Sequence, residues 1–159
     1  MIPNSSQFAM KTLEVASLGY HPNAEVSFQV SVEPVSLLER FVVSLVDESG
    51  NNGIAVAIYP ATGEVCDISR GGEVIDYLSL APLVPGEPVP CELSIYRFGK
   101  NFVCSVRIQG EVFLYPAFSY DGNTSFTAMV GREKEGNDGA ELRISEMKLN
   151  IVEQQPIAA

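Results

Sequence analysis

The pattern of hydrophobic and polar positions is most informative in the stretch Cys91–Leu114. The alternation runs through three segments, which are separated by the pairs Gly99-Lys100 and Gln109-Gly110. A period of two is typical of a strand with one buried face. Glycine in the first position suits a type II′ hairpin, and Gly110 supplies the positive φ that the second turn requires. The pattern therefore predicts three consecutive antiparallel strands.

The two short turns also predict the register of these strands. Closure at Gly99-Lys100 places Phe98 opposite Asn101, and therefore Ile95 opposite Cys104. One face is then apolar and is expected in the core: Leu93, Ile95, Phe102, Cys104, Val106, Phe113 and Tyr115. The other face is mixed: Glu92, Ser94, Tyr96, Phe98, Asn101, Val103, Ser105, Arg107, Val112 and Leu114.

Strand patterns recur through the rest of the chain. Glu25–Val32 alternates cleanly, which predicts one face in contact with water. Phe41–Val46 and Ile54–Tyr59 are apolar on both faces and are expected to be central strands. Further strands are expected at 13–18, 64–68, 73–78, 126–130 and 141–152. The last of these changes phase, which implies a bulge or bend near Ser145-Glu146.

About eleven short strands and no amphipathic helix pattern predict an all-β fold, a two-sheet antiparallel sandwich. The chain has 159 residues, which suits one domain with a sizeable core, at about 12–153, and frayed ends. Ala81–Pro90 is rich in proline and has three interpretations: an inter-domain linker, a polyproline II ligand, or a rigid crossover within one domain. We favour the crossover, because neither half of the chain supplies a complete sheet.

The formal net charge of −10 indicates an acidic surface, which repels nucleic-acid phosphates and anionic lipids. We therefore expect no nucleic-acid partner and no membrane partner. No run approaches the about 18–20 apolar residues of a membrane span, and the first residues lack a signal-peptide pattern. We expect a cytoplasmic location if the chain is complete and an extracellular one if it is an excised domain. The oligomeric state stays open.

The three cysteines show no metal-ligand spacing, so zinc is not expected. Cys91 lies four residues, about 13 Å, along the strand from the residue opposite Cys104. A disulfide needs Cα atoms within about 7 Å, so the predicted register excludes that pair. Cys66 could still pair with either one. Free buried thiols are the favoured interpretation, consistent with a reducing compartment.

Three stretches together resemble the concanavalin A-like jelly roll, particularly its laminin-G-like and pentraxin-like members. They are the early strand Val26–Val32, the strand pair within Arg97–Gly110, and the ending Gly139–Leu149. The resemblance covers about residues 25–152 and implies that the N- and C-terminal strands are adjacent. The chain departs from the family pattern in having Gln109-Gly110 instead of Asp-Gly and in lacking Trp. Such folds host lectins, adhesion modules, glycosidases and structural domains, so function does not follow from the resemblance.

The mixed face of the central strands offers hydroxyl groups, two aromatic rings and a possible cross-strand ion pair between Glu92 and Arg107. These groups are typical of a sugar-binding face, because rings stack on apolar sugar surfaces while polar groups reach the hydroxyls. The alternative is that the two rings pack under a loop or against the other sheet, since aromatic side chains are mostly buried. The candidate ligand-binding residues are Ser94, Tyr96, Phe98, Ser105 and Arg107.

Catalytic patterns are weak. Glucanases of this jelly-roll class carry Glu-x-Asp-x-x-Glu on one strand, and the chain has no such string. The nearest acid pairs, Glu73/Asp76 and Glu141/Glu146, have spacings that put their members on opposite faces of a regular strand. The one histidine, His21, lies in a turn-like context. We therefore name no catalytic residue and favour a protein that is not an enzyme.

A calcium ion is the one cofactor that the sequence leaves open. Asp121 and Asn123 supply hard oxygen ligands in a loop, and Gly136–Gly139 and the acidic segment Asp47–Asn52 are similar. Asp and Asn beside Gly are equally the usual residues of turns, and we favour the turn interpretation.

These observations lead to three functional hypotheses. The first is a non-catalytic binding module, with a carbohydrate as its ligand. The alternative is a protein-interaction or self-assembling structural sandwich that buries the apolar part of the same face, Phe98, Val103, Val112 and Leu114. The third is a glycoside hydrolase with an unrecognised carboxylate pair.

Overall fold

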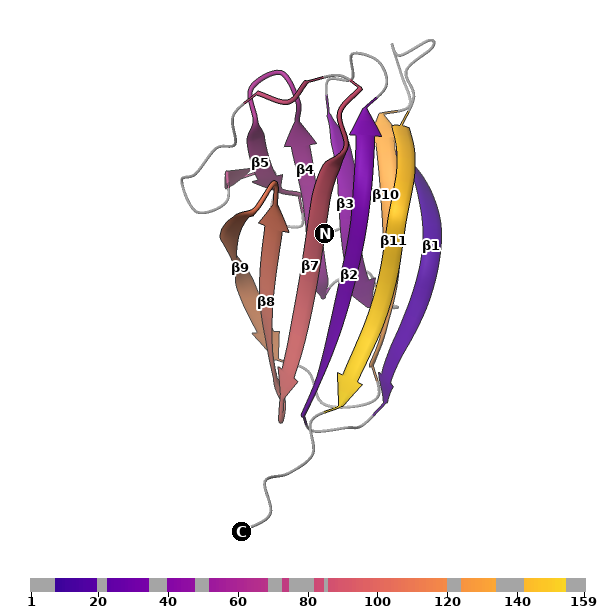
Figure 1. The fold of residues 1–159 in the computed structure, drawn as a ribbon. Helices are drawn as coiled ribbons and strands as arrows, with labels where there is room; N and C mark the ends of the chain where they lie inside the picture. Colours follow the sequence, from indigo (N-terminus) through magenta and orange to yellow (C-terminus); the bar gives the residue numbers. More distant parts are fainter. Residues whose placement is uncertain are drawn as a thin grey trace.

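The computed structural model describes residues 8–19, 23–34, 40–47, 52–68, 73–74, 82–84, 86–119, 124–133 and 142–153. Its strands form two antiparallel sheets that face each other (Figure 1). The two-sheet sandwich predicted from the alternation is therefore confirmed. Nowhere in the described part of the chain does a helix reach the length and hydropathy of a membrane span.

The first sheet has six strands in the order β1-β10-β3-β4-β5-β6. The two continuous apolar runs form β3 and β4, which occupy its centre as predicted. Every residue of β3 is buried, because both of its faces are covered. The bounds are β1 (Phe8–Gly19), β3 (Phe41–Asp47), β4 (Gly53–Tyr59), β5 (Glu64–Asp67), β6 (Glu73–Val74) and β10 (Thr124–Glu133).

The second sheet has five strands in the order β11-β2-β7-β8-β9. The predicted register of its central hairpin is confirmed, with Phe98 opposite Asn101 and Ile95 opposite Cys104. β11 pairs with β2, and its register shifts between Ser145 and Lys148, which confirms the predicted bulge. The bounds are β2 (Asn23–Pro34), β7 (Val89–Phe98), β8 (Asn101–Ile108), β9 (Glu111–Ser119) and β11 (Leu142–Glu153).

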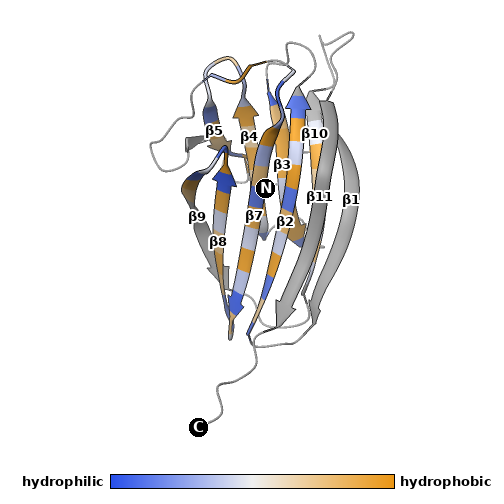
Figure 2. Ribbon diagram, viewed as in Figure 1, coloured by the Kyte–Doolittle hydropathy of each residue, from blue (hydrophilic) through white to orange (hydrophobic). Residues whose placement is uncertain are grey.

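The core fills the space between the two sheets with apolar side chains from the alternate positions that face inward. Figure 2 shows the result as alternating hydrophobic and hydrophilic bands on β2 and β7. Each large buried side chain contributes about 1.5–3 kcal/mol relative to an exposed one. The buried phenylalanines are Phe28, Phe41, Phe102, Phe113 and Phe126.

Both predicted hairpin turns are present. Gly99 has φ 63°, as a type II′ turn requires at its first central position. At the second turn both Gln109 (φ 54°) and Gly110 (φ 81°) are left-handed, the pattern of a type I′ turn. The Gln109 N–H donates to the carbonyl of Pro90 at 3.0 Å and ties this turn to β7.

The proline-rich segment connects β6 of one sheet to β7 of the other. Leu83 packs against the core, and its N–H donates to the carbonyl of Pro60 at 2.8 Å. The Glu87 N–H donates to the carbonyl of Val84 at 3.1 Å. These contacts are those of a crossover between the sheets, the interpretation that the sequence favoured.

The terminal strands β1 and β11 lie at the same side of the sandwich, as edge strands of different sheets (Figure 1). They are neighbours across the two layers and not hydrogen-bonded partners. β11 instead returns along β2, the early strand of the resemblance.

Candidate functional site

The five-stranded sheet turns one side to the core and the other outward. Along β8 the burial alternates strictly, with Phe102, Cys104, Val106 and Ile108 buried and the residues between them exposed. We call the outward side of β2, β7 and β8 the open face. Its described members are Asn23, Glu25, Ser27, Gln29, Ser31, Glu33, Pro90, Glu92, Ser94, Tyr96, Phe98, Asn101, Val103, Ser105 and Arg107.

The structure brings all five sequence-predicted site residues to this open face. Ser94 and Ser105 are opposite each other, and Tyr96 is opposite Val103. Phe98 is 63% exposed, so its ring does not pack under a loop or against the other sheet. Tyr96 is half-buried. The predicted residues therefore form a continuous strip along the central hairpin.

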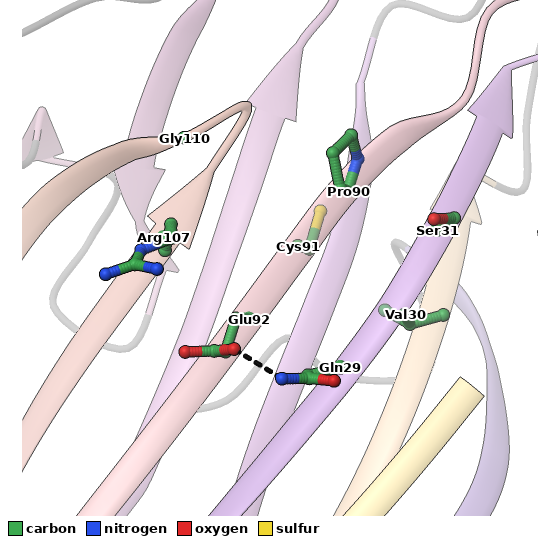
Figure 3. A pocket seen from close by; sticks show the side chains of 8 residues that line it. All are labelled: Gln29, Val30, Ser31, Pro90, Cys91, Glu92, Arg107 and Gly110. Atoms are coloured by element: carbon green, nitrogen blue, oxygen red, sulfur yellow. Dashed lines mark hydrogen bonds between the residues drawn. The ribbon is translucent and has the colours of Figure 1, made fainter. Parts of the chain in front are cut away.

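A pocket of about 260 Å³ lies at one end of the open face, beside the Gln109-Gly110 turn. Of the five predicted residues only Arg107 lines it, and the other four lie on the face outside it. The lining includes polar side chains from three neighbouring strands (Figure 3). Those that matter below are Gln29, Ser31, Pro90, Glu92, Arg107 and Gly110.

The Glu92 carboxylate is held by β2 and not by β8. Gln29 Nε2 donates to Glu92 Oε2 at 2.6 Å (Figure 3). Glu92 is opposite Arg107, as the register predicted. The expected ion pair between them is not among the contacts of the described residues, so that expectation is wrong. Glu92 lies on a central strand with a neighbour on each side, and its carboxylate takes the partner on β2.

Arg107 is exposed and makes no hydrogen bond or ion pair with any residue that the structure describes. Its guanidinium group carries five N–H donors in a fixed plane and stays charged at all ordinary pH values. A pocket with an oriented carboxylate on one strand and a guanidinium on the next offers both an acceptor and a donor to a polar ligand.

Sequence reasoning missed Gln29 and Pro90 as pocket residues and did not count Glu92 as one. The signal for Gln29 was present, because Ser27, Gln29 and Ser31 were predicted to form the water-facing side of the early strand; Gln29 is exposed there, whereas Ser31 is 6% exposed. That signal did not identify the neighbouring strand. The pairing of β2 with β7, which brings Gln29 beside Glu92, joins segments far apart in the chain.

The other end of the open face is anchored by a buried arginine. Arg97 is 4% exposed and lies on the core side of β7. Its guanidinium carbon lies 5.3 Å from the centre of the Phe102 ring, and its Nε donates to the Gly99 carbonyl at 3.0 Å. A cation over an aromatic ring is favourable when both are removed from water. These contacts fix the turn that follows Phe98 and thereby place its exposed ring.

All three cysteines are free and buried, which confirms the predicted free thiols. Burial raises the pKa of Cys91 and of Cys104 to about 12. The pKa of Cys66 is also raised, first by burial and then by the nearby Glu64, against a smaller lowering by Arg40. A thiol must lose its proton to act as a nucleophile, so none of the three is activated.

The candidate calcium residues Asp121 and Asn123 lie outside the described residues, as does Gly136–Gly139. In the third acidic loop the Asp47 carboxylate accepts hydrogen bonds from Asn52, from its N–H at 3.2 Å and from Nδ2 at 2.9 Å. These contacts are those of a turn. Among the described residues no group of three or more His, Cys, Asp or Glu could hold a metal ion.

The acid pairs considered for catalysis are only partly described. Asp76 and Glu141 lie outside the described residues, and so does His21. Within the described part of the chain the pocket is lined by one carboxylate, that of Glu92. Hydrolysis of a glycosidic bond by the usual mechanism needs two carboxyl groups flanking that bond.

No protein-family model matches the chain, and no curated protein matches it in sequence. Solved structures do match its fold. A human SPRY domain is 15% identical with a TM-score of 0.50, over 89% of this chain and 86% of that one. A carbohydrate-binding module, CBM66 from Bacillus subtilis, is 10% identical with a TM-score of 0.52, over 92% of this chain and 83% of that one.

A family 7 alginate lyase, solved in complex with its substrate, is also similar. It is 10% identical with a TM-score of 0.55, over 87% of this chain and 66% of the lyase chain. This chain has the concanavalin A-like fold. At such low identities the likeness extends to the fold alone, so the role of this concanavalin A-like sandwich must be argued from its own open face.

Proposed function

We propose that the protein is a non-catalytic binding module and that its ligand is a carbohydrate, held on the open face of the five-stranded sheet. The observation that carries the proposal is the strip from the pocket to Phe98. At about 3.3 Å per residue, the six steps along β7 from Glu92 to Phe98 span about 20 Å. A platform of that length accommodates several sugar rings in a row.

The chemistry of the strip suits a sugar chain. Phe98 and Tyr96 present ring surface on which the C–H faces of a sugar can stack. Ser94 and Ser105 follow along the strip, and the pocket adds the Glu92 acceptor and the Arg107 donors. A few directed polar groups within an apolar and aromatic surface are the usual composition of a small-molecule site.

The fold comparisons support the proposal in general terms. One structure with this fold is a carbohydrate-binding module, and another is an alginate lyase in complex with its substrate. The first favours binding and the second keeps catalysis as a rival. Hydrolysis is the less favoured alternative, because the described part of the pocket has a single carboxylate, one fewer than glycoside hydrolysis requires.

A glycan array followed by isothermal titration tests the proposal. We expect at least one oligosaccharide to bind above background, and Phe98→Ala to weaken it about tenfold, or about 1.4 kcal/mol. Val84→Ala is the matched control, because Val84 is 53% exposed but is not on β2, β7 or β8 and does not line the pocket. No binding with either Ca²⁺ or EDTA present, or equal losses in both variants, would contradict the proposal.

A second candidate function is self-association through the same face. Two large hydrophobic side chains of this face are strongly exposed, Phe98 at 63% and Val103 at 56%, and Val112 on the neighbouring β9 is 49% exposed. Phe98 and Val103 are diagonal neighbours on β7 and β8, and adjacent exposed apolar side chains are typical of interaction surfaces. Light scattering over a range of concentrations decides the matter. A dimer that Phe98→Glu abolishes would support this candidate, and a monomer at every concentration would exclude it.

A further inference from the structure

We propose that the pocket binds one neutral sugar ring through two adjacent hydroxyl groups, and that it discriminates against sugars that carry a carboxylate. This inference rests on the proposed function and specifies its ligand class. It follows from the arrangement of Gln29, Glu92 and Arg107, which come from three neighbouring strands.

The first argument is orientation. The 2.6 Å hydrogen bond from Gln29 Nε2 occupies Glu92 Oε2 and fixes the carboxylate. Glu92 Oε1 and Gln29 Oε1 are left with acceptor capacity. A carboxylate held by a neighbouring amide loses little freedom when a ligand hydroxyl binds it, so the acceptor is prepared in advance.

The second argument is the pairing of acceptor and donor. Glu92 and Arg107 are directly opposite on strands that lie about 4.8 Å apart. Two hydroxyls on neighbouring ring carbons can span that distance, one donating to the Glu92 carboxylate and the other accepting from the Arg107 guanidinium. Both protein groups are charged, and hydrogen bonds with one charged partner are roughly twice as strong as neutral ones.

The third argument is charge. A sugar carboxylate in this pocket is attracted by the Arg107 guanidinium and repelled by the Glu92 carboxylate, so the two lining charges offset each other and the net charge of −10 of the chain decides against the anion. Like charges at close range repel. A neutral ring meets no such penalty.

The fourth argument is size. The pocket of about 260 Å³ is just below the about 300–1,000 Å³ that is usual for drug-sized ligands. It therefore holds one ring, and the rest of a longer sugar chain continues along Ser94 and Ser105 toward Tyr96.

The test is the isosteric variant Glu92→Gln, which keeps the shape of the side chain and removes its charge. Backbone amide shifts of ¹⁵N-labelled protein are followed during titration with methyl glucoside, galactoside and mannoside, and with glucuronate and galacturonate. For the wild type we expect a neutral glycoside to bind more tightly than either uronate and to shift the amides of Gln29, Glu92 and Arg107. Glu92→Gln should weaken the neutral glycoside about tenfold. The same variant should strengthen uronate binding, because the repulsion is gone.

Glu111→Gln is the matched control. Glu111 is exposed next to the Gln109-Gly110 turn, does not line the pocket, and loses the same charge. We expect it to leave both classes of sugar unchanged. Thermal unfolding of both variants checks that each is folded before binding is compared.

The outcomes separate this inference from the function on which it rests. Uronates that bind the wild type more tightly than neutral sugars would overturn the inference and leave carbohydrate binding intact. The inference would also be overturned, with carbohydrate binding intact, if Phe98→Ala weakens the binding of an oligosaccharide while Glu92→Gln changes no affinity. Absence of binding by every glycan tested would overturn both.

Discussion

The outward sides of the two sheets differ sharply, although both sheets contribute alternate residues to the same core. On β3 the outward residues Val42 and Ser44 are completely buried. On β8 the outward residues Val103 and Ser105 are exposed. The same residue types, valine and serine, thus occupy opposite environments in the two sheets.

This difference shows what the two sequence patterns mean physically. A continuous apolar run such as that of β3 is stable only if both faces are removed from water, whereas an alternating run needs one covered face. A binding site on a sheet needs a face that stays uncovered. The open face of the five-stranded sheet meets that condition, and the outer side of β3 and β4 does not.

The strongest test of the comparison introduces the same charge on both sheets. Val42→Asp places an unpaired carboxylate at a position with no exposure, and we expect a loss of more than about 4 kcal/mol, enough to prevent folding. Val103→Asp, at a position 56% exposed, should change the free energy of unfolding by less than about 1 kcal/mol. Urea unfolding, or the yield of folded protein, measures both. Equal effects would mean that the two outer sides do not differ as described.

Alkaline unfolding tests whether the inner side of the five-stranded sheet excludes water as completely as the outer side of β3 does. The folded-state pKa values of Cys91 and Cys104 are raised from 9.0 to about 12. Above pH 9 the unfolded chain releases thiol protons that the folded protein keeps. The contribution of the two thiols to the free energy of unfolding is therefore fully present below pH 9 and is lost as the pH rises from 9 to 12. At pH 10.5 the expected loss is about 2 kcal/mol for each thiol.

Urea unfolding at pH 7.5 and 10.5 measures this loss, and the double variant Cys91→Ala/Cys104→Ala is the comparison because other groups also titrate in this range. We expect the variant to lose about 4 kcal/mol less than the wild type between the two pH values. Identical losses would show that these thiols are accessible to water.

The smallest predicted effect concerns the serines. Ser44 Oγ is buried and makes no hydrogen bond with any residue that the structure describes, and a buried unsatisfied hydroxyl is costly. Ser44→Ala should therefore stabilise the protein by about 1 kcal/mol, while Ser105→Ala on the open face should be neutral in stability. Thermal unfolding of the two variants measures the difference, and a destabilised Ser44→Ala would show that its hydroxyl has a partner after all.

Local patterns predicted the fold well because the central strands are joined by two-residue turns. A two-residue turn fixes which residues of the two strands are opposite each other, and for this reason the positions opposite Phe98 and Ile95 were predicted correctly. The same local pattern gave no indication that Gln109 adopts a positive φ, since glutamine is not a residue that favours it. That conformation is imposed by the hairpin, whose strands require a type I′ turn.

The candidate site was predicted only in its local part. Residues of β7 and β8 share a hairpin, so their common face follows from alternation. Gln29 is 63 residues from Glu92 in sequence, and no local pattern predicts that β2 is the strand beside β7. The prediction of an ion pair between Glu92 and Arg107 was wrong for the same reason. Glu92 has a neighbouring strand on each side, and the sequence identified only β8 as a neighbour of β7.

The pairing of β2 with β11 also has a consequence for how the protein is made. β2 emerges from the ribosome well before β11, which covers one of its edges. Until then the backbone N–H and C=O groups along that edge have no partner, beside the apolar side chains of Val26 and Phe28. Unpaired strand edges are templates for aggregation. The chain is therefore exposed to pairing with other chains along that edge until β11 is in place.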